Sequence, residues 1–119
     1  MQYTTFIKKN VDFKRMYYRE RFKVGFFSVI YLKKIKFNGT LLGITASKKV
    51  GNAVERNRVR RIIKAAYRDL EKLENLKGLC LVIVAKKSCL NVKSYDVFKE
   101  LKRNIYSLKN SKFLHRKRV

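Results

Sequence analysis

The segment from Asn52 to Arg68 concentrates cations in a pattern that suits the binding of phosphate groups. It reads N-A-V-E-R-N-R-V-R-R-I-I-K-A-A-Y-R, and the arginines in the first turns of the expected helix are Arg56, Arg58, Arg60 and Arg61. A helix N-terminus already carries about half a positive charge, so each nearby cation typically costs about 0.3–1 kcal/mol. A chain that departs so densely from this preference is suited to a ligand that supplies negative charge, and phosphate is the expected one.

The helix that must position these cations is predicted to begin at Asn52, which can act as N-cap, with Glu55 three residues later as in a capping box. At about 100° per residue, one narrow stripe is apolar. Its members are Val59, Ile62, Ile63, Ala66, Leu70 and Leu73. The opposite side is cationic, with Arg60, Arg61, Lys64, Arg68 and Lys72. The pattern predicts an amphipathic helix that packs on a sheet and turns a basic face to solvent.

Two sets of uncharged side chains leave alternatives open. Asn57, between Arg56 and Arg58, is either a solvated surface amide or a hydrogen-bonding group for bases, riboses and phosphates. The aromatic residues either pack in the core or offer a stacking surface for unpaired bases, and Lys14 beside the first of them favours a single-strand groove. These aromatic residues are Phe13, Tyr17 and Tyr31.

The sequence offers little for catalysis by protein side chains. His115, the single histidine, lies in an expected loose tail, which is a poor place for a general base. Cys80 and Cys89 are too few and wrongly spaced for a zinc site or a disulfide framework, and a buried reduced thiol is expected. No catalytic residue and no metal ligand is predicted.

Composition and charge indicate a polyanionic partner. The 119 residues are 46% hydrophobic, enough for a folded core, and carry a formal net charge of +23. No apolar run approaches the roughly 20 residues that a membrane span needs, and the start of the chain lacks the apolar core of a secretory signal. We expect a cytoplasmic protein with a nucleic-acid partner that is a single domain over residues 1–119, with a flexible basic tail over about 109–119, and no membrane partner.

Periodicity predicts the remaining elements. A short helix is expected after Asn10, and a strand over Gly25–Lys36 with alternating faces. Asn38-Gly39 is a two-residue hairpin signal, which would pair that strand with the next one, over Thr40–Ser47.

After the long helix, Lys77-Gly78 is expected to act as a stop signal, and Leu79–Ala85 is an unbroken apolar run typical of a buried strand. Ser94 can cap a final helix, whose inward residues would be Val97, Phe98, Leu101, Ile105 and Leu108. The predicted fold is a small α+β sandwich in the order α-β-β-(β)-α-β-α.

The stretch Ser47–Arg68 resembles the signature of the bacterial ribonuclease P protein family, K-x-G-x-A-x-x-R-N-x-x-K-R followed by a further basic residue. The residues in register are Lys49, Gly51, Ala53, Arg56, Asn57 and Arg61. The chain departs at Arg60, where the family often has lysine, and at Lys64, where it often has arginine, so charge is kept. The segment Asn10–Tyr17 also looks like the first helix of that family.

This resemblance implies an accessory subunit of an endoribonuclease in which a catalytic RNA removes the 5′ leader from precursor tRNA. The RNA would hold the Mg²⁺ ions and supply the catalytic groups, and the protein alone would be monomeric. The residues expected to contact the catalytic RNA are Lys48, Lys49, Gly51, Asn52, Arg56, Asn57, Arg58, Arg60, Arg61, Lys64 and Arg68. The residues expected to line the leader groove are Phe13, Lys14, Tyr17 and Tyr31. A left-handed strand-helix-strand crossover is implied as well.

Two other classes of protein have similar features. A ribosomal or other structural RNA-binding protein shares the basic α+β composition, and only the signature separates it from the first interpretation. A nuclease with its own active site is disfavoured by the shortage of catalytic side chains.

Overall fold

A computed structural model describes residues 1–7 and 21–110 of the chain. Its elements in chain order are β1 (Thr4–Phe6), β2 (Arg21–Val24), β3 (Ser28–Lys34), β4 (Thr40–Thr45), α2 (Ala53–Leu73), β5 (Leu79–Ala85), the 3-10 helix η1 (Lys87–Asn91) and α3 (Ser94–Asn110). The helix predicted after Asn10 and most of the predicted tail lie outside the described residues.

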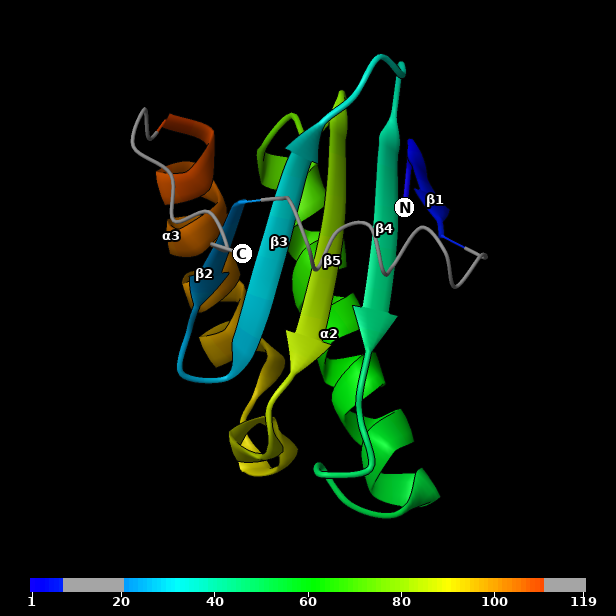
Figure 1. The fold of residues 1–119 in the computed structure, drawn as a ribbon, viewed down its shortest axis with the longest axis vertical. Coiled ribbons are helices and arrows are strands. Elements are labelled where there is room, and N and C mark those ends of the chain that lie inside the picture. Colours follow the sequence, from blue (N-terminus) through cyan, green and yellow to red (C-terminus); the bar gives the residue numbers. More distant parts are fainter. Residues whose placement is uncertain (8–20, 111–119) are drawn as a thin grey trace, which may run out of the picture.

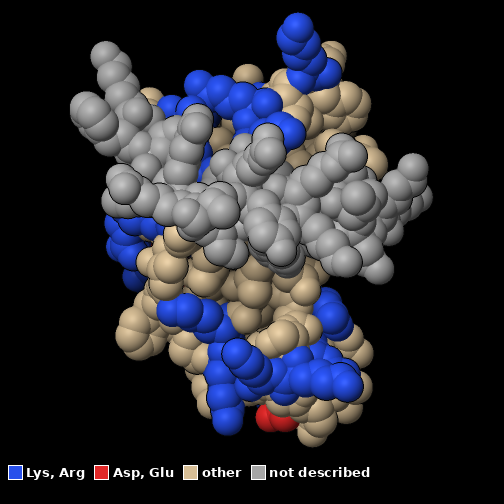
Figure 2. Space-filling model, viewed as in Figure 1, with Lys and Arg blue, Asp and Glu red and all other residues tan. Residues whose placement is uncertain are grey.

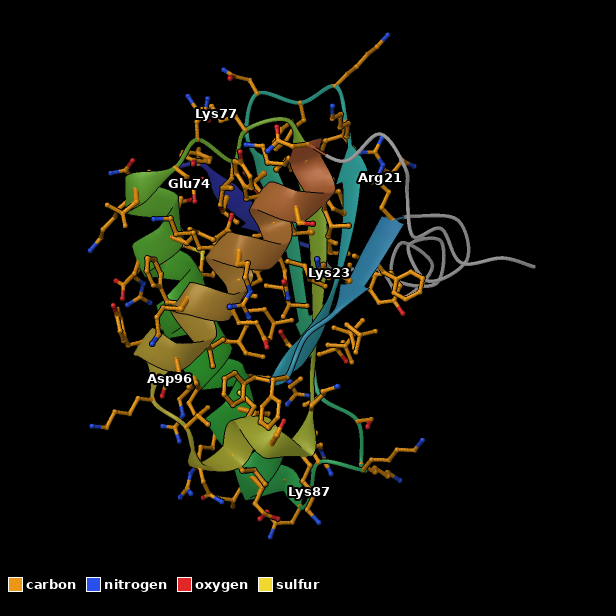
Figure 3. The ribbon with its side chains drawn as sticks, turned by 90° about the vertical axis from the view of Figure 1, so that its left-hand side faces the viewer. Arg21, Lys23, Glu74, Lys77, Lys87 and Asp96 are labelled. Carbon is orange, nitrogen blue, oxygen red and sulfur yellow. The ribbon has the colours of Figure 1, made fainter. Side chains whose placement is uncertain are left out.

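The strands form one five-stranded sheet in the order β1-β4-β5-β3-β2. β5 is parallel to β4 and antiparallel to β3, while β1 is parallel to β4 at one edge and β2 is antiparallel to β3 at the other. Helices α2 and α3 lie side by side on the same face of this sheet (Figures 1 and 3). The α+β class is therefore confirmed, and no strand was predicted at the positions of the short strands β1 and β2.

The connection from β4 through α2 to β5 is left-handed. Both strands point the same way in Figure 1, α2 passes behind the sheet, and β5 lies to the left of β4. Crossovers of this kind are right-handed in the great majority of proteins. The left-handed crossover that the family resemblance implied is present, and no periodicity in the sequence could have predicted it.

The hairpin predicted at Asn38-Gly39 is wrong, because β3 and β4 are not neighbours. Strand β5 lies between them and pairs with β3 over its whole length and with β4 from Leu79 to Val84. A strand that is apolar on both faces is most stable in the centre of a sheet, and this long-range preference overrides a local turn signal. The chain at Gly39 instead crosses the start of β5, where the Gly39 carbonyl accepts a hydrogen bond from the Gly78 amide at 2.7 Å.

The strand predicted over Gly25–Lys36 begins later, at Ser28, and the alternation predicted within it is confirmed. Ile30 and Leu32 face the helices and are buried, whereas Tyr31 lies on the other face. Gly25 belongs to the turn from β2, where a Cβ would collide with the carboxylate of Glu100. That buried carboxylate accepts hydrogen bonds from the turn amides of Phe26 and Phe27, so a side chain at position 25 would displace it from these amides.

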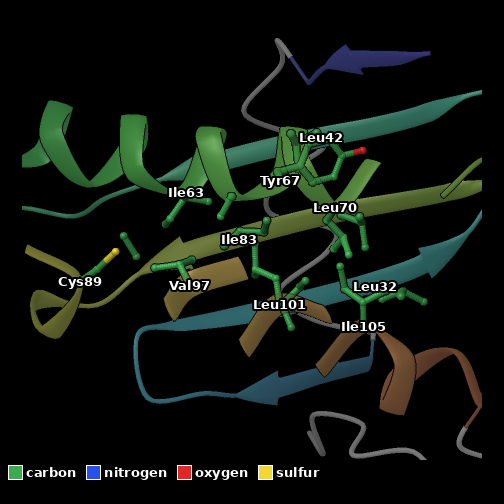
Figure 4. Close-up of a cluster of buried hydrophobic side chains, with 14 of the residues drawn as sticks. Leu32, Leu42, Ile63, Tyr67, Leu70, Ile83, Cys89, Val97, Leu101 and Ile105 are labelled. Carbon is green, nitrogen blue, oxygen red and sulfur yellow. The ribbon is translucent and has the colours of Figure 1, made fainter. Parts of the chain in front are cut away.

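The core lies between the sheet and the two helices (Figure 4). Most of the predicted inward residues of α2 and α3 are buried there, and Ile62 and Phe98 are partly buried. Leu73 is the exception, because it is 66% exposed at the last residue of α2. The predicted stop at Lys77-Gly78 was late: the C-cap is Glu74, and Gly78, with φ +83°, leads into β5.

Two polar residues of α2, Tyr67 and Glu71, point inward instead, toward the unpredicted strand β1. The hydroxyl groups of Tyr67 and Thr4 are 2.8 Å apart, and burial raises the pKa of Tyr67 to about 12. The carboxylate of Glu71 accepts a hydrogen bond from the amide of Gln2 at 2.7 Å. The inward positions of Tyr67 and Glu71 were not predicted, because their partners lie in or beside β1, a strand that was not predicted.

Strand β2 is tied to α3 through its two cations. Arg21 Nη1 donates to the carbonyl of Leu108 at 3.1 Å, and Lys23 Nζ donates to Ser107 Oγ at 3.1 Å (Figure 3). Within residues 1–7 and 21–110, no helix is long and apolar enough to cross a membrane.

Candidate nucleic-acid interface

The predicted capping box at the start of α2 is confirmed. Asn52 Oδ1 accepts from the amide of Glu55 at 2.9 Å, and Glu55 Oε1 accepts from the amide of Asn52 at 3.0 Å. Gly51, with φ +151°, precedes the cap, and a Cβ there would collide with the Glu55 carboxylate. Local structure therefore accounts for Gly51, Asn52 and Glu55. The Glu55 carboxylate already accepts a hydrogen bond from the backbone amide of Asn52.

The arginines of α2 use only neutral acceptors. Arg56 Nη1 donates to the carbonyl of Gly51 at 2.8 Å, and Arg60 Nη1 donates to Asn57 Oδ1 at 3.1 Å. The salt bridge recorded among residues 1–7 and 21–110 joins Lys99 Nζ to Asp96 Oδ1 at 3.8 Å, so no cation of α2 is paired with a carboxylate in that part of the chain. The described residues therefore leave the positive charge of this helix available to an external anion.

The predicted cations form a nearly continuous exposed surface that runs from the β4–α2 connection along α2. Its exposed members are Lys48, Lys49, Arg58, Arg61, Lys64 and Arg68, and Arg56 and Arg60 are partly exposed. We call these eight residues the α2 cationic surface. Figure 2 shows lysine and arginine side chains gathered at the end of the molecule where Figure 1 places the β4–α2 connection.

Part of this surface borders an open hollow of about 600 Å³. The predicted residues Asn57, Arg60, Arg61 and Lys64 line it together with three apolar side chains that the sequence reasoning missed, Phe6, Ile44 and Val54. Phe6 was missed because it belongs to β1, and no pattern in the sequence points to that strand.

The residues predicted to line a leader groove can be placed only in part. Phe13, Lys14 and Tyr17 lie outside the described residues. Tyr31 is half-buried on the sheet face opposite α2 and α3, where its ring centroid is 5.5 Å from that of Phe22. Burial raises the pKa of Tyr31. The aromatic partner Phe22, on β2, was not identified from the sequence.

The described residues offer no group of three or more His, Cys, Asp or Glu side chains that could hold a metal ion. Both cysteines are buried, as predicted for Cys80, and burial together with the nearby charge of Glu100 raises the pKa of Cys89 to about 11. His115 lies outside the described part of the chain.

Comparisons with known proteins agree on one family. A family model described as Ribonuclease P matches residues 1–109. The chain is 40% identical over 97 residues to the ribonuclease P protein component of Clostridioides difficile, which covers 81% of this chain and 84% of that protein. It is 37% identical over 112 residues to the protein of the same name from Listeria monocytogenes, and the match covers 93% of this chain and 91% of that protein.

Solved structures show the same fold. The RNase P protein of Staphylococcus aureus superposes with a TM-score of 0.72 at 26% identity, which covers 85% of this chain and 92% of that one. The RNase P protein of Thermotoga maritima superposes with a TM-score of 0.73 at 20% identity, and the superposition covers 92% of this chain and 99% of that one.

Proposed function

Because this chain belongs to the bacterial ribonuclease P protein family, we propose that its α2 cationic surface binds the catalytic RNA and that its sheet holds the 5′ leader of precursor tRNA. Membership makes it the protein component of a ribonuclease that works as a ribonucleoprotein in tRNA processing. The proposal concerns which of its residues meet which RNA.

The observation that carries the proposal is the absence of any internal neutralisation of α2 among the described residues. Arg56 and Arg60 donate to uncharged oxygens, and Arg61 is exposed. Arginine forks match phosphate oxygens bidentately, and such charge-assisted hydrogen bonds are about twice as strong as neutral ones. The helix N-terminus adds its own partial positive charge at the same place.

The connection before α2 extends this contact. Lys48 and Lys49 are exposed in the turn, and Gly51 and Asn52 complete it, so backbone and lysine groups lie beside the first arginines of the helix. In the proposed complex these groups and Asn57 bind phosphates and riboses, Arg58 and Arg68 extend the phosphate contacts along the helix, and the net charge of +23 offsets repulsion between two RNAs.

For the leader, the proposal uses the sheet face opposite the helices. Tyr31 and Phe22 form a tilted aromatic pair there. Stacking of unpaired bases on such rings is typically worth about 1–3 kcal/mol per base. Phe13, Lys14 and Tyr17 are proposed to contribute from their segment, by the family resemblance of that segment alone.

No protein side chain makes or breaks a bond in this proposal. Mg²⁺ ions held by the RNA subunit would supply the activated water, and this chain would bind, orient and neutralise. The chain is proposed to act as a monomer in the cytoplasm.

The test is cleavage of a leader-bearing precursor tRNA at low Mg²⁺, with the RNA subunit and this protein added together or separately. We expect the protein to stimulate the RNA and to be inactive alone. Arg56→Ala combined with Arg61→Ala should remove most of the stimulation. Lys99→Ala combined with Lys102→Ala removes the same charge from α3 and should keep it. Cleavage by the protein alone, or equal loss in both double variants, would contradict the proposal.

A further inference from the structure

The hollow beside α2 exists because β1 is short. β1 ends at Phe6, which pairs with Leu42, whereas β4 continues to Thr45. The amide of Ile7 still donates to the carbonyl of Leu42 at 2.9 Å, and beyond that point Ile44 has no partner strand on this side among the described residues. The first turns of α2 form the opposite wall.

The floor of the hollow is apolar and open to solvent. Phe6 is 38% exposed and Val54 is 67% exposed, so neither side chain serves mainly to fill the core, and Ile44 beside them is half-buried. Large apolar side chains gathered in a concave site, with a few polar groups around them, are typical of ligand sites, and about 600 Å³ is within their usual size range.

The rim is cationic and carries one amide. Arg60, Arg61 and Lys64 line it, and no carboxylate of residues 1–7 or 21–110 does. Lys64 Nζ lies 5.3 Å from the centroid of the Phe6 ring, so one cation is held directly over the aromatic floor. Asn57 Oδ1 accepts from Arg60, which leaves the Asn57 amide nitrogen to donate to a ligand.

This combination fits a nucleotide better than a phosphate backbone alone. Phosphate contacts need cations but no apolar floor, whereas an unpaired base needs an aromatic or apolar surface beside the phosphate site. A second copy of this chain fits poorly, because two molecules of charge +23 repel each other and the described residues of the rim offer no anion.

We propose that this hollow, which we call the Phe6 pocket (Phe6, Ile44, Val54, Asn57, Arg60, Arg61 and Lys64), receives one unstacked nucleotide of the catalytic RNA. Its base lies against Phe6 and Val54, and its phosphates lie at the cationic rim. The inference rests on the proposed function, because the pocket is continuous with the α2 cationic surface. It adds that the protein holds a nucleobase at this site as well as phosphates.

The first experiment uses small probes on the free protein. Amide chemical shifts of the isotope-labelled protein are followed during titration with adenosine monophosphate, uridine monophosphate and ribose 5-phosphate. We expect shifts at Phe6, Val54 and Asn57, and binding of a nucleotide about tenfold tighter than that of ribose 5-phosphate, which is the size of effect that one stacked base gives. Equal binding of all three probes would overturn the inference.

Variants then locate the effect. Phe6→Ala and Val54→Ser should each reduce the preference for nucleotide over ribose 5-phosphate. The exposed position of Val54 makes its replacement safe for folding, which keeps the test valid if Phe6→Ala weakens the edge strand. Leu73→Ala, at the far end of the same helix and also exposed, is the matched control and should change nothing.

The second experiment separates this inference from the proposed function. Affinity for the catalytic RNA is measured across a range of salt concentrations. Phe6→Ala should weaken binding about tenfold at every salt concentration, because a stacking contact releases no counterions. Arg61→Ala should instead lower the salt slope by about one. An effect of Arg61→Ala without any effect of Phe6→Ala or Val54→Ser would overturn the base pocket alone, and no effect of any of them would overturn the docking surface as well.

Discussion

The carboxylate of Glu71, near the end of α2, is buried and accepts a hydrogen bond from the backbone amide of Gln2 at 2.7 Å. The hydroxyl of Thr4 donates to the same carboxylate. Together these contacts attach β1 to α2, and β1 carries Phe6 to the edge of the cationic surface. Together with the pairing of β1 with β4, this acidic residue on the helix therefore helps to position Phe6 in the Phe6 pocket.

Glu71→Gln should destabilise the fold by about 1–3 kcal/mol at pH 7, because hydrogen bonds to a charged acceptor contribute about that much. Burial acts to raise the pKa of Glu71, but the hydrogen bonds from Thr4, Gln2 and Tyr3 outweigh it and the net shift is downward. A lowered pKa in the folded state means that this stabilisation is present above the unfolded value, about 4.3, and is lost as pH falls through the folded value.

The measurement is urea unfolding of both proteins between pH 7 and pH 3. The difference in free energy of unfolding should be constant near neutrality and shrink below about pH 4.3. Glu74→Gln is the matched control, because the Glu74 side chain makes no hydrogen bond or salt bridge to the described residues, and this variant should behave as the parent does. A difference that grows as pH falls would contradict the role of the Glu71 carboxylate.

Gly25→Ala should destabilise the protein by about 1–3 kcal/mol, the usual cost of overpacking. The added Cβ collides with the buried carboxylate of Glu100. That carboxylate must then move away from the backbone amides from which it accepts hydrogen bonds. A double-mutant cycle with Glu100→Ala, measured by thermal unfolding, tests the cause. The cost of Gly25→Ala should fall in the Glu100→Ala background, and strictly additive costs would refute the collision.

RNA binding by this protein should weaken steeply with salt, because each phosphate neutralised by a lysine or arginine releases counterions. Arg58→Ala removes one exposed cation that makes no hydrogen bond or salt bridge to the described side chains and should lower the slope of log affinity against log salt by about one. Lys102→Ala, on α3, is the control with the same change in charge and should leave the slope unchanged. Filter binding at several salt concentrations measures both.

The thiol of Cys89 should be unreactive in the folded protein. Burial raises its pKa to about 11, so at pH 8 nearly all of it is the thiol, and the reactive thiolate is also shielded from reagent. Native protein should react slowly with a thiol reagent and quickly after urea unfolding. Lys87→Cys places an exposed thiol two residues away and should react at once. Rapid reaction of native Cys89 would mean that η1 opens readily.

Predictions from the sequence were accurate where a local pattern decides the structure. The capping box of Asn52 and Glu55 is a contact between residues three apart, and the central strand β5 follows from its own apolar run. The cations of the α2 cationic surface were also identified, since the sequence of one helix defines its faces.

The sequence could not predict features that depend on contacts between distant segments. The turn signal at Asn38-Gly39 contains no information about β5. This strand lies between β3 and β4, although its residues come about 40 positions later in the chain. β1 is three residues long and carries no periodic pattern, so the strand could not be predicted. The inward positions of Tyr67 and Glu71, which contact this segment, and the place of Phe6 in the pocket could therefore not be predicted either.

The central position of β5 also constrains the order in which the protein can mature during translation. Neither β3 nor β4 can pair with β5 until the ribosome has added Leu79–Ala85, although both are synthesised well before it. Until then the described sheet can form only as two separate halves, the β2–β3 pair and the β1–β4 pair, which β5 later joins. The arginines of α2 therefore leave the ribosome before the sheet that will support them exists.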